Sequence, residues 1–194
     1  FAQVYDKLLF ELFAQLDFRF LSRPAFSLFK KLFGAINMKN SAIIENESDS
    51  SLFVAKFDLA GLKMLWEIAW KARDNSVSED AMFHIIRLHL TLAPQLRSSI
   101  NTIYHESIRT CMDHLMECAQ RAAALKPQLA NSNAIGTANS QLGDLILEME
   151  RCFCILHKFL STVQSKSLSH IHGSGNNSSA LALSATSNQT SAVY

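Results

Sequence analysis

Residues 95–125 read QLRSSINTIYHESIRTCMDHLMECAQRAAAL and carry the strongest secondary-structure signal in the chain. The 3.6-residue period of an α-helix with one buried face places apolar side chains three or four residues apart. That spacing occurs here at Ile100, Tyr104, Ile108, Cys111, Leu115, Cys118 and Ala122. We therefore predict one long α-helix over residues 95–125, the longest in the chain, packed along its whole length.

The residues that follow predict a partner for this helix. Residues 126–139 contain Pro127 and several Asn, Ser and Gly, which indicates an insertion in the connection. Residues 141–163 return to a helical pattern. Residues 164–194 are rich in Ser, Asn and Thr without any period, so we expect a disordered tail or linker there. The predicted apolar face of the helix over 141–163 consists of Leu142, Leu145, Met149, Phe153, Leu156 and Leu160.

Two more helix pairs are predicted nearer the N-terminus. Residues 58–73 form one helix, and a second begins at the capping box Ser76-Val77-Ser78-Glu79 and stops before Pro94. Residues 1–38 form a helical hairpin whose second helix starts at the N-cap Ser22. Residues 39–57 predict a polar loop between the pairs. The first helix, over residues 2–17, is expected to bury a wide face of Val4, Leu8, Leu12 and Leu16 beside Tyr5, Leu9 and Phe13.

These patterns predict an all-α fold of stacked antiparallel helix pairs. Helix pairs of about 40 residues bury a continuous core only by stacking on one another, as in HEAT and armadillo solenoids. We therefore interpret residues 58–163 as a helical-repeat segment of that kind. A closed helical bundle is the alternative, because the sequence repetition between the pairs is weak.

Composition excludes several classes of function. The 194 residues are 48% hydrophobic and 18% charged, with 18 Lys plus Arg against 17 Asp plus Glu. No basic run longer than Lys30-Lys31 is present, which argues against nucleic acid as a partner. Acidic and basic residues interrupt the Phe-rich start, so we expect no membrane span. The chain begins at Phe1, within an amphipathic pattern, and we expect it to be cut from a longer polypeptide.

The four cysteines indicate a reducing compartment. Cys111 and Cys118 lie seven residues apart on one predicted helix, so their Cα atoms are about 10 Å apart, beyond disulfide reach. Cys152 and Cys154 point to different sides of another predicted helix. We therefore expect a cytoplasmic protein, with the nucleus as the alternative location.

Cysteine and histidine at helical spacing could bind a metal or form a nucleophilic site, but core packing explains them better. Cys111, His114 and Cys118 share one helical face, and zinc accepts such ligands. Cysteines within an apolar stripe usually pack as small hydrophobes, and one helix rarely supplies three ligands. Trp66 and Trp70, one turn apart, are expected in the core. We also considered nucleophilic catalysis by Cys111 with His114 or by Cys154 with His157, but a mid-helix thiol lacks the surroundings of an active thiolate. We predict no catalytic, cofactor-binding or metal-binding residue and no cofactor.

Several segments together resemble a known family. They are residues 61–69 (GLKMLWEIA), the helical positions Val77, Ala81, Ile85 and Leu88, residues 107–115 (SIRTCMDHL) and residues 150–160 (ERCFCILHKFL). Their combination and order resemble the helical region that precedes the catalytic domain in very large ubiquitin-specific proteases of the fat facets and puffyeye type. The resemblance covers residues 58–163.

The resemblance implies that the parent polypeptide is a thiol protease that removes ubiquitin from proteins. Neither the Gly-Asn-Thr-Cys core of the family's cysteine box nor its Gly-His-Tyr histidine box occurs in this chain, so no catalytic residue carries over. The implied role is a non-catalytic scaffold that contacts ubiquitinated substrates, regulators or the rest of the enzyme. The alternatives are a segment of a HEAT-like adaptor or transport scaffold, and a small helical enzyme or metal site built on Cys111, His114 and Cys118.

Overall fold

The computed structural model describes residue 4 and residues 7–45, 51–129 and 135–173, with side chains through residue 161. The chain divides into two units, Phe1–Leu160 and Ser161–Tyr194. The contacts discussed below lie in the first unit, and the second contains the C-terminal end of helix α6 (Ile135–Gly173). Within the part of the chain that is described, no helix is both long and apolar enough for a membrane span.

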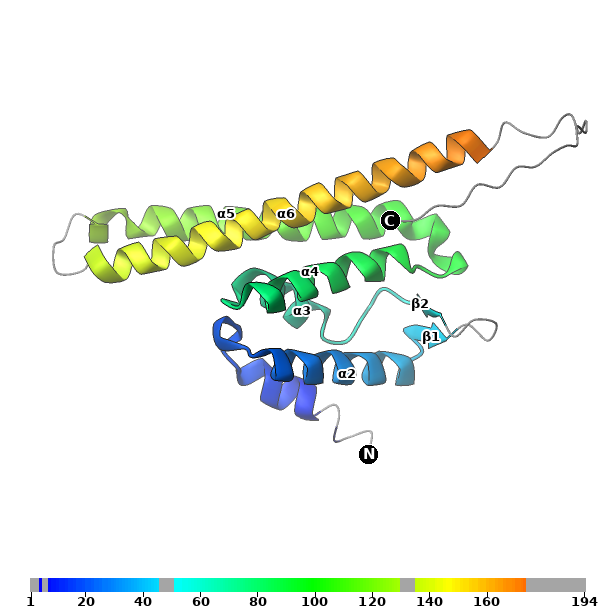
Figure 1. The fold of residues 1–194 in the computed structure, drawn as a ribbon, viewed down its shortest axis with the longest axis horizontal. Helices are drawn as coiled ribbons and strands as arrows, with labels where there is room; N and C mark the ends of the chain where they lie inside the picture. Colours follow the sequence, from blue (N-terminus) through cyan, green and yellow to red (C-terminus); the bar gives the residue numbers. More distant parts are fainter. Residues whose placement is uncertain (1–3, 5–6, 46–50, 130–134, 174–194) are drawn as a thin grey trace, which may run out of the picture. The chain divides into compact units, whose positions relative to one another are not determined.

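The framework is all-α, as predicted from the sequence. The helices α2 (Arg23–Lys39), α3 (Leu62–Lys71), α4 (Asn75–Leu90), α5 (Ile100–Leu129) and α6 follow one another along the chain (Figure 1). α3 packs against α4. α5 and α6 lie side by side and share a core of Cys118, Leu125 and Leu145 (Figure 1).

The N-terminal turns differ from the α-helix predicted over residues 2–17. Leu8–Leu12 (η1) is a π-helical turn, and Phe13–Gln15 (η2) and Phe18–Phe20 (η3) are 3-10 turns. Leu9 and Phe13 are buried, and the centroid of the Phe13 ring lies 5.6 Å from that of Phe29 in α2. For the other side of the predicted face the prediction is wrong, because Val4, Leu12 and Leu16 are exposed.

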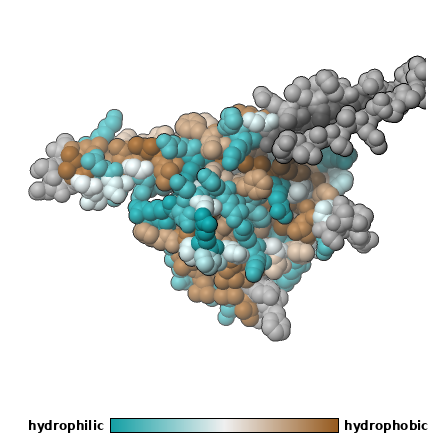
Figure 2. Space-filling model, viewed as in Figure 1, coloured by the Kyte–Doolittle hydropathy of each residue, from teal (hydrophilic) through white to brown (hydrophobic). Residues whose placement is uncertain are grey.

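A pattern that is apolar on two sides does not specify which side packs, and here contact with α2 selects the Leu9 side. The exposed side contributes to the brown surface at the lower edge of Figure 2, where Figure 1 places these turns. α2 itself begins as predicted, with the Ser22 Oγ accepting a hydrogen bond from the Ala25 N–H and Pro24 in the first turn.

The predicted polar loop over residues 39–57 contains a small antiparallel sheet. β1 (Ile43–Glu45) pairs with β2 (Leu52–Val54), with Ile43 opposite Val54. The buried Val54 also exchanges backbone hydrogen bonds with residues 91 and 93, just beyond α4. Three-residue strands are too short to show an alternating pattern, which is why the sequence carries no strand signal here. Residues 46–50 of the predicted loop lie outside the described residues.

The α3–α4 hairpin is present, but its cap differs from the prediction. The N-cap of α4 is Asp74, whose carboxylate accepts a 2.9 Å hydrogen bond from the Ser76 N–H. The predicted cap, Ser76, lies inside the helix, because an Asp two residues earlier can cap equally well. Ser78 is buried and donates a 2.6 Å hydrogen bond to the carbonyl oxygen of Ala69, which ties α4 to α3.

α5 and α6 differ from their predicted bounds, and α6 rather than α5 is the longest described helix. Residues 95–99 belong to a 3-10 segment, η4 (Pro94–Ser99), and α5 then continues through Pro127 to Leu129. Pro127 lies in the last turn; it cannot donate a hydrogen bond to the carbonyl oxygen of Ala123, but only two residues of helix follow it, so little of α5 is affected. α6 begins six residues earlier than predicted and continues to Gly173, so residues 164–173 of the predicted tail are helical. At 39 residues α6 is longer than α5, which has 30, and residues 130–134 and 174–194 lie outside the described part.

The buried face of α6 is rotated from the prediction. Phe153 is 58% exposed and Leu160 is also exposed, although both were expected in the core. The prediction is right for Leu145, which is buried, and for Leu142 and Met149, which pack partly buried against the same core. Beyond them the buried positions are Glu148, Cys152, Ile155 and Phe159, which the prediction missed. α6 is apolar around much of its circumference, so the three-and-four spacing can be traced along more than one side. The face that packs contains a carboxylate, and this carboxylate belongs to the site described next.

Candidate functional site

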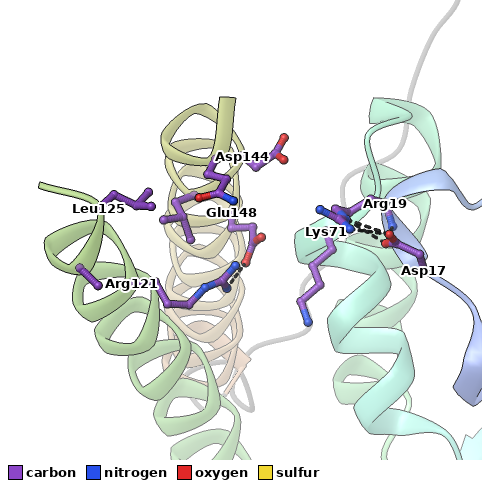
Figure 3. A pocket seen from close by; sticks show the side chains of 10 residues that line it. Asp17, Arg19, Lys71, Arg121, Leu125, Asp144 and Glu148 are labelled. Carbon is purple, nitrogen blue, oxygen red and sulfur yellow. Dashed lines mark hydrogen bonds and ion pairs between the residues drawn. The ribbon is translucent and has the colours of Figure 1, made fainter. Parts of the chain in front are cut away.

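A charged cleft lies between the α5–α6 hairpin and the segment formed by α3 and the N-terminal turns. Its volume is about 530 Å³, and Figure 3 shows its polar lining. Three acidic and three basic side chains face it, so its formal charge is balanced. They are Asp17, Asp144 and Glu148 on the acidic side and Arg19, Lys71 and Arg121 on the basic side.

Ion pairs order the rim of this cleft. Arg19 and Asp17 form a 2.6 Å salt bridge, and the hydrogen bonds from Arg19 hold the pKa of Asp17 below its usual value. Arg73 joins α6 by a 2.9 Å salt bridge to Asp144, while its backbone N–H donates to the carbonyl oxygen of Arg19. The rim is therefore a set of exposed or half-buried pairs linking three segments of the chain.

Glu148 lies at the base of the cleft and is only 4% exposed. Burial acts to raise its pKa, but the hydrogen bond from His114 and the positive charge of Arg121 outweigh burial and lower the pKa below its ordinary value. The Arg121 guanidinium lies 3.6 Å from the Glu148 carboxylate (Figure 3). Glu148 is thus a buried, ionised carboxylate on the packed face of α6.

Behind the cleft, Glu148 meets His114 and Cys118 of α5. The His114 Nε2 is 3.0 Å from the Glu148 Oε2, and the Cys118 Sγ is 3.6 Å from Nε2 and 3.7 Å from Oε2. All three residues are buried, and their ligand-type atoms lie within 4.8 Å of one another. We call this group the His-Cys-Glu cluster.

Aromatic packing fixes the histidine of the cluster. The Trp70 ring of α3 stacks on the His114 imidazole, with centroids 3.9 Å apart and an interplanar angle of 7°. On the other nitrogen, the Glu117 carboxylate lies 3.8 Å from the His114 Nδ1. Trp66 and Trp70 are buried, as expected, and both also line a second cleft that reaches His114.

A buried arginine anchors the same region. Arg151 of α6 donates a 2.7 Å hydrogen bond to the carbonyl oxygen of Trp70 and a 3.0 Å hydrogen bond to the Asn75 side chain. Burial lowers its pKa from the ordinary arginine value, although the charge of Glu148 opposes that shift. Arg151 therefore joins α6 to the α3–α4 connection one turn from the cluster.

The cluster differs from the set that the sequence suggested. His114 and Cys118 share a helical face as predicted, but Cys111 lies outside the group and Glu148 takes its place. The signal that identifies Glu148 is a charged residue at a position of the apolar series Leu145, Glu148, Cys152, Ile155. Continuing the face of α6 from Met149 to Phe153, rather than from Glu148 to Cys152, concealed that signal.

The buried thiols are protonated at neutral pH. All four cysteines are free. Burial raises the pKa of Cys111 to about 12, and burial together with the negative charge of Glu148 raises that of Cys118 to about 11. Burial likewise raises the pKa of Cys152. These surroundings suit packing or metal ligation better than nucleophilic attack, which needs an accessible thiolate.

Fold and site together define an all-helical region in which a His-Cys-Glu cluster is buried between α5 and α6. No family model matches the chain. Over 115 residues it is 24% identical to ubiquitin carboxyl-terminal hydrolase 24 of Mus musculus and equally to that of Homo sapiens. The match covers 59% of this chain and 4% of each relative. This distant similarity supports a region related to the ubiquitin-specific proteases.

Proposed function

We propose that this chain is a non-catalytic scaffold segment of a very large deubiquitinase of the fat facets and puffyeye type. The observation that carries the proposal is its similarity to a small part of ubiquitin carboxyl-terminal hydrolase 24, in a chain built from helix pairs. The segment acts through protein contacts, with ubiquitinated substrates, regulators or the rest of the parent enzyme as partners. Its free cysteines fit a cytoplasmic or nuclear setting.

The state of the thiols supports a scaffold role. A ubiquitin-specific protease of the thiol class needs a thiolate that can reach the isopeptide carbonyl. Cys111, Cys118 and Cys152 are buried and hold their protons more firmly than a free thiol. Cys154 is the one exposed cysteine, so the activity probe described below is directed mainly at it.

Exposed apolar side chains on the last hairpin support stacking of a further element, as in a solenoid. Ile146, Phe153 and Leu160 are exposed at intervals of seven residues, which is two helical turns, so they follow one side of α6. Met112 and Met116 are exposed on α5. Faces of this kind are buried between neighbouring pairs in HEAT-like repeats. We name the α6 residues Ile146, Phe153 and Leu160 the outer α6 face.

An activity probe tests the non-catalytic half of the proposal. The 194-residue chain is treated with ubiquitin carrying a C-terminal vinyl sulfone, which alkylates the nucleophilic cysteine of an active deubiquitinase. We expect no adduct, whereas an active ubiquitin-specific protease treated in parallel is labelled. An adduct that disappears on Cys154→Ser, or on substitution of any other single cysteine, contradicts the proposal.

The scaffold half is tested in the parent polypeptide. Phe153→Asp should leave cleavage of a ubiquitin–fluorophore conjugate unchanged and slow the release of ubiquitin from modified proteins, because the catalytic site is intact and a contact is lost. Glu150→Gln, an exposed substitution on the same helix, is the matched control. If Phe153→Asp releases ubiquitin from modified proteins as fast as the wild type and Glu150→Gln do, the outer α6 face has no scaffold role. A reading frame that encodes further helix pairs and no Gly-Asn-Thr-Cys box favours a HEAT-like adaptor instead.

A further inference from the structure

We propose that His114, Cys118 and Glu148 bind a zinc ion through Nε2, Sγ and Oε2. The proposal is independent of the deubiquitinase relationship, because it depends only on the geometry of the His-Cys-Glu cluster. Two helices bring these three atoms together: α5 supplies the imidazole and the thiol one turn apart, and α6 supplies the carboxylate.

The distances within the cluster match those between ligands of one metal ion. Zinc bonds of about 2.0 to 2.3 Å in tetrahedral geometry place a sulfur and a nitrogen, or a sulfur and an oxygen, about 3.5 to 3.7 Å apart. The corresponding separations here are 3.6 Å for Cys118 to His114 and 3.7 Å for Cys118 to Glu148. The His114–Glu148 distance of 3.0 Å is shorter by about 0.3 Å than the tetrahedral value, which a small side-chain rotation corrects.

A common centre exists for the three atoms. A triangle with these edges has a point about 2.0 Å from every corner, which is the length of a zinc bond to nitrogen or oxygen; the longer zinc–sulfur bond needs the sulfur to lie about 0.3 Å farther away. A thiolate, an imidazole and a carboxylate together select zinc over magnesium and calcium, which prefer oxygen ligands alone. Three protein ligands leave one position for water, and each of the two neighbouring clefts is lined by one ligand, Glu148 or His114.

The surroundings orient the ligands. The stacked Trp70 ring holds the imidazole plane. The exposed Glu117 carboxylate lies 3.8 Å from Nδ1, so a rotation of this side chain would bring it within hydrogen-bond distance of the Nδ1–H. Arg121 contacts the Glu148 carboxylate from the cleft side, at 3.6 Å.

Charge and protons balance in the bound state. Cys118 gives up its thiol proton to solvent as the sulfur–zinc bond forms, and the His114 proton moves from Nε2 to Nδ1 with no net change. Zinc with one thiolate and one carboxylate is then formally neutral, which makes its burial beside Arg121 acceptable. The ion joins α5 to α6 directly, so it acts as a structural tie within the last hairpin.

Metal binding by the purified 194-residue chain tests the proposal. The protein is stripped with a chelator and titrated with zinc chloride against a chromophoric competitor, and in parallel with cobalt(II), whose thiolate charge-transfer absorption reports sulfur ligation. We expect one zinc per chain and a thiolate–cobalt band. Cys118→Ser should abolish the band and weaken zinc binding by more than the roughly 10- to 100-fold that outer-shell changes cause.

Matched variants separate ligation from folding. Cys111→Ser and Cys152→Ser alter equally buried thiols outside the cluster and should retain the band and the zinc affinity. Glu148→Gln should weaken zinc binding while keeping the band, with helix content checked by circular dichroism. The proposal is wrong if the wild-type chain binds no zinc, if cobalt shows no thiolate band, or if Cys111→Ser loses as much affinity as Cys118→Ser.

Discussion

His89 of α4 and His114 of α5 are buried to a similar degree, at 2% and 6% exposure, yet their surroundings differ. The His89 Nδ1 lies 2.8 Å from the carbonyl oxygen of Ile85, and its Nε2 lies 2.6 Å from the Ser107 hydroxyl. Because a carbonyl only accepts, Nδ1 carries the proton and Nε2 accepts from Ser107. The rings of Phe57 and Phe159 complete this pocket. His114 instead faces Glu148 on one nitrogen and Glu117 on the other.

The contrast shows that burial alone does not assign a role to a histidine. At His89 the neighbours are neutral, and burial lowers the pKa to about 4, so the imidazole is an uncharged packing group. At His114 a buried carboxylate and a thiol converge on one nitrogen, which is an arrangement suited to a cation. Whether the histidine is a packing group or a candidate ligand depends on the side chain that another helix places beside it: Ser107 of α5 for His89 and Glu148 of α6 for His114. The apolar period of a single helix does not show which side chain that is.

The largest expected effect comes from placing a charge in the core beside the cluster. Leu115 is buried next to His114 but has no polar partner, so Leu115→Asp should lower the free energy of unfolding by about 3 to 5 kcal/mol. Met116→Asp, at a side chain that is 55% exposed, is the matched control and should change little. Urea titrations of both variants measure the difference. If Leu115→Asp is as stable as the wild type, Leu115 has polar surroundings like those of His114 and does not lie in the apolar core.

The second effect is a loss of stability in mild acid. The unfolded chain protonates histidine near pH 6.5, whereas folded His89 resists protonation down to about pH 4 because it is buried. The stabilising contribution of neutral His89 is therefore fully present above pH 6.5. It is lost as the pH decreases towards 4, by about 3 kcal/mol for a pKa shift of this size. Burial and the charges of Arg87 and Lys30 lower the pKa of His84 to about 4 as well, so it adds to the same slope.

Unfolding free energies from urea titrations at pH 7.5, 6 and 5 check this slope. His89→Leu should reduce the slope and leave the part due to His84. A wild-type stability that stays constant over this range would show that His89 is not an uncharged packing group in the folded protein.

The sequence predicted the elements better than their faces. The long stripe from Ile100 to Ala122 identified α5 because a single apolar series runs through it, and Cys111, Leu115 and Cys118 are buried as expected. α6 and the N-terminal turns are apolar on more than one side, so spacing alone could not select the packed side. Phe153 and Leu12 were placed in the core for that reason, and both are exposed.

The cluster was half predicted for a related reason. His114 and Cys118 lie on one helix, where their relation follows from the period, whereas Glu148 reaches them from α6 across a tertiary contact. The β1–β2 pair also escaped prediction, because Val54 is fixed mainly by its hydrogen bonds with residues 91 and 93 rather than by a local pattern. Local periodicity predicts what one helix presents, and tertiary packing determines what meets it.

The smallest expected effect isolates the polar contact that makes His89 a packing group. The Ser107 Oγ lies 2.6 Å from the His89 Nε2 and 3.0 Å from the carbonyl oxygen of Ile103 one turn earlier, and its single proton serves the imidazole. Ser107→Ala leaves a buried nitrogen without its donor, so the free energy of unfolding should fall by about 1 to 2 kcal/mol. Thr110 makes the same one-turn contact to the carbonyl oxygen of Glu106 at 2.8 Å but is only half-buried, and Thr110→Ala is the matched control, with a change within about 0.5 kcal/mol. Thermal and urea unfolding of the two variants at pH 7.5 measure both values. Equal losses would mean that the hydroxyl stabilises α5 only locally and that the Ile85 carbonyl and the aromatic rings hold His89 without it.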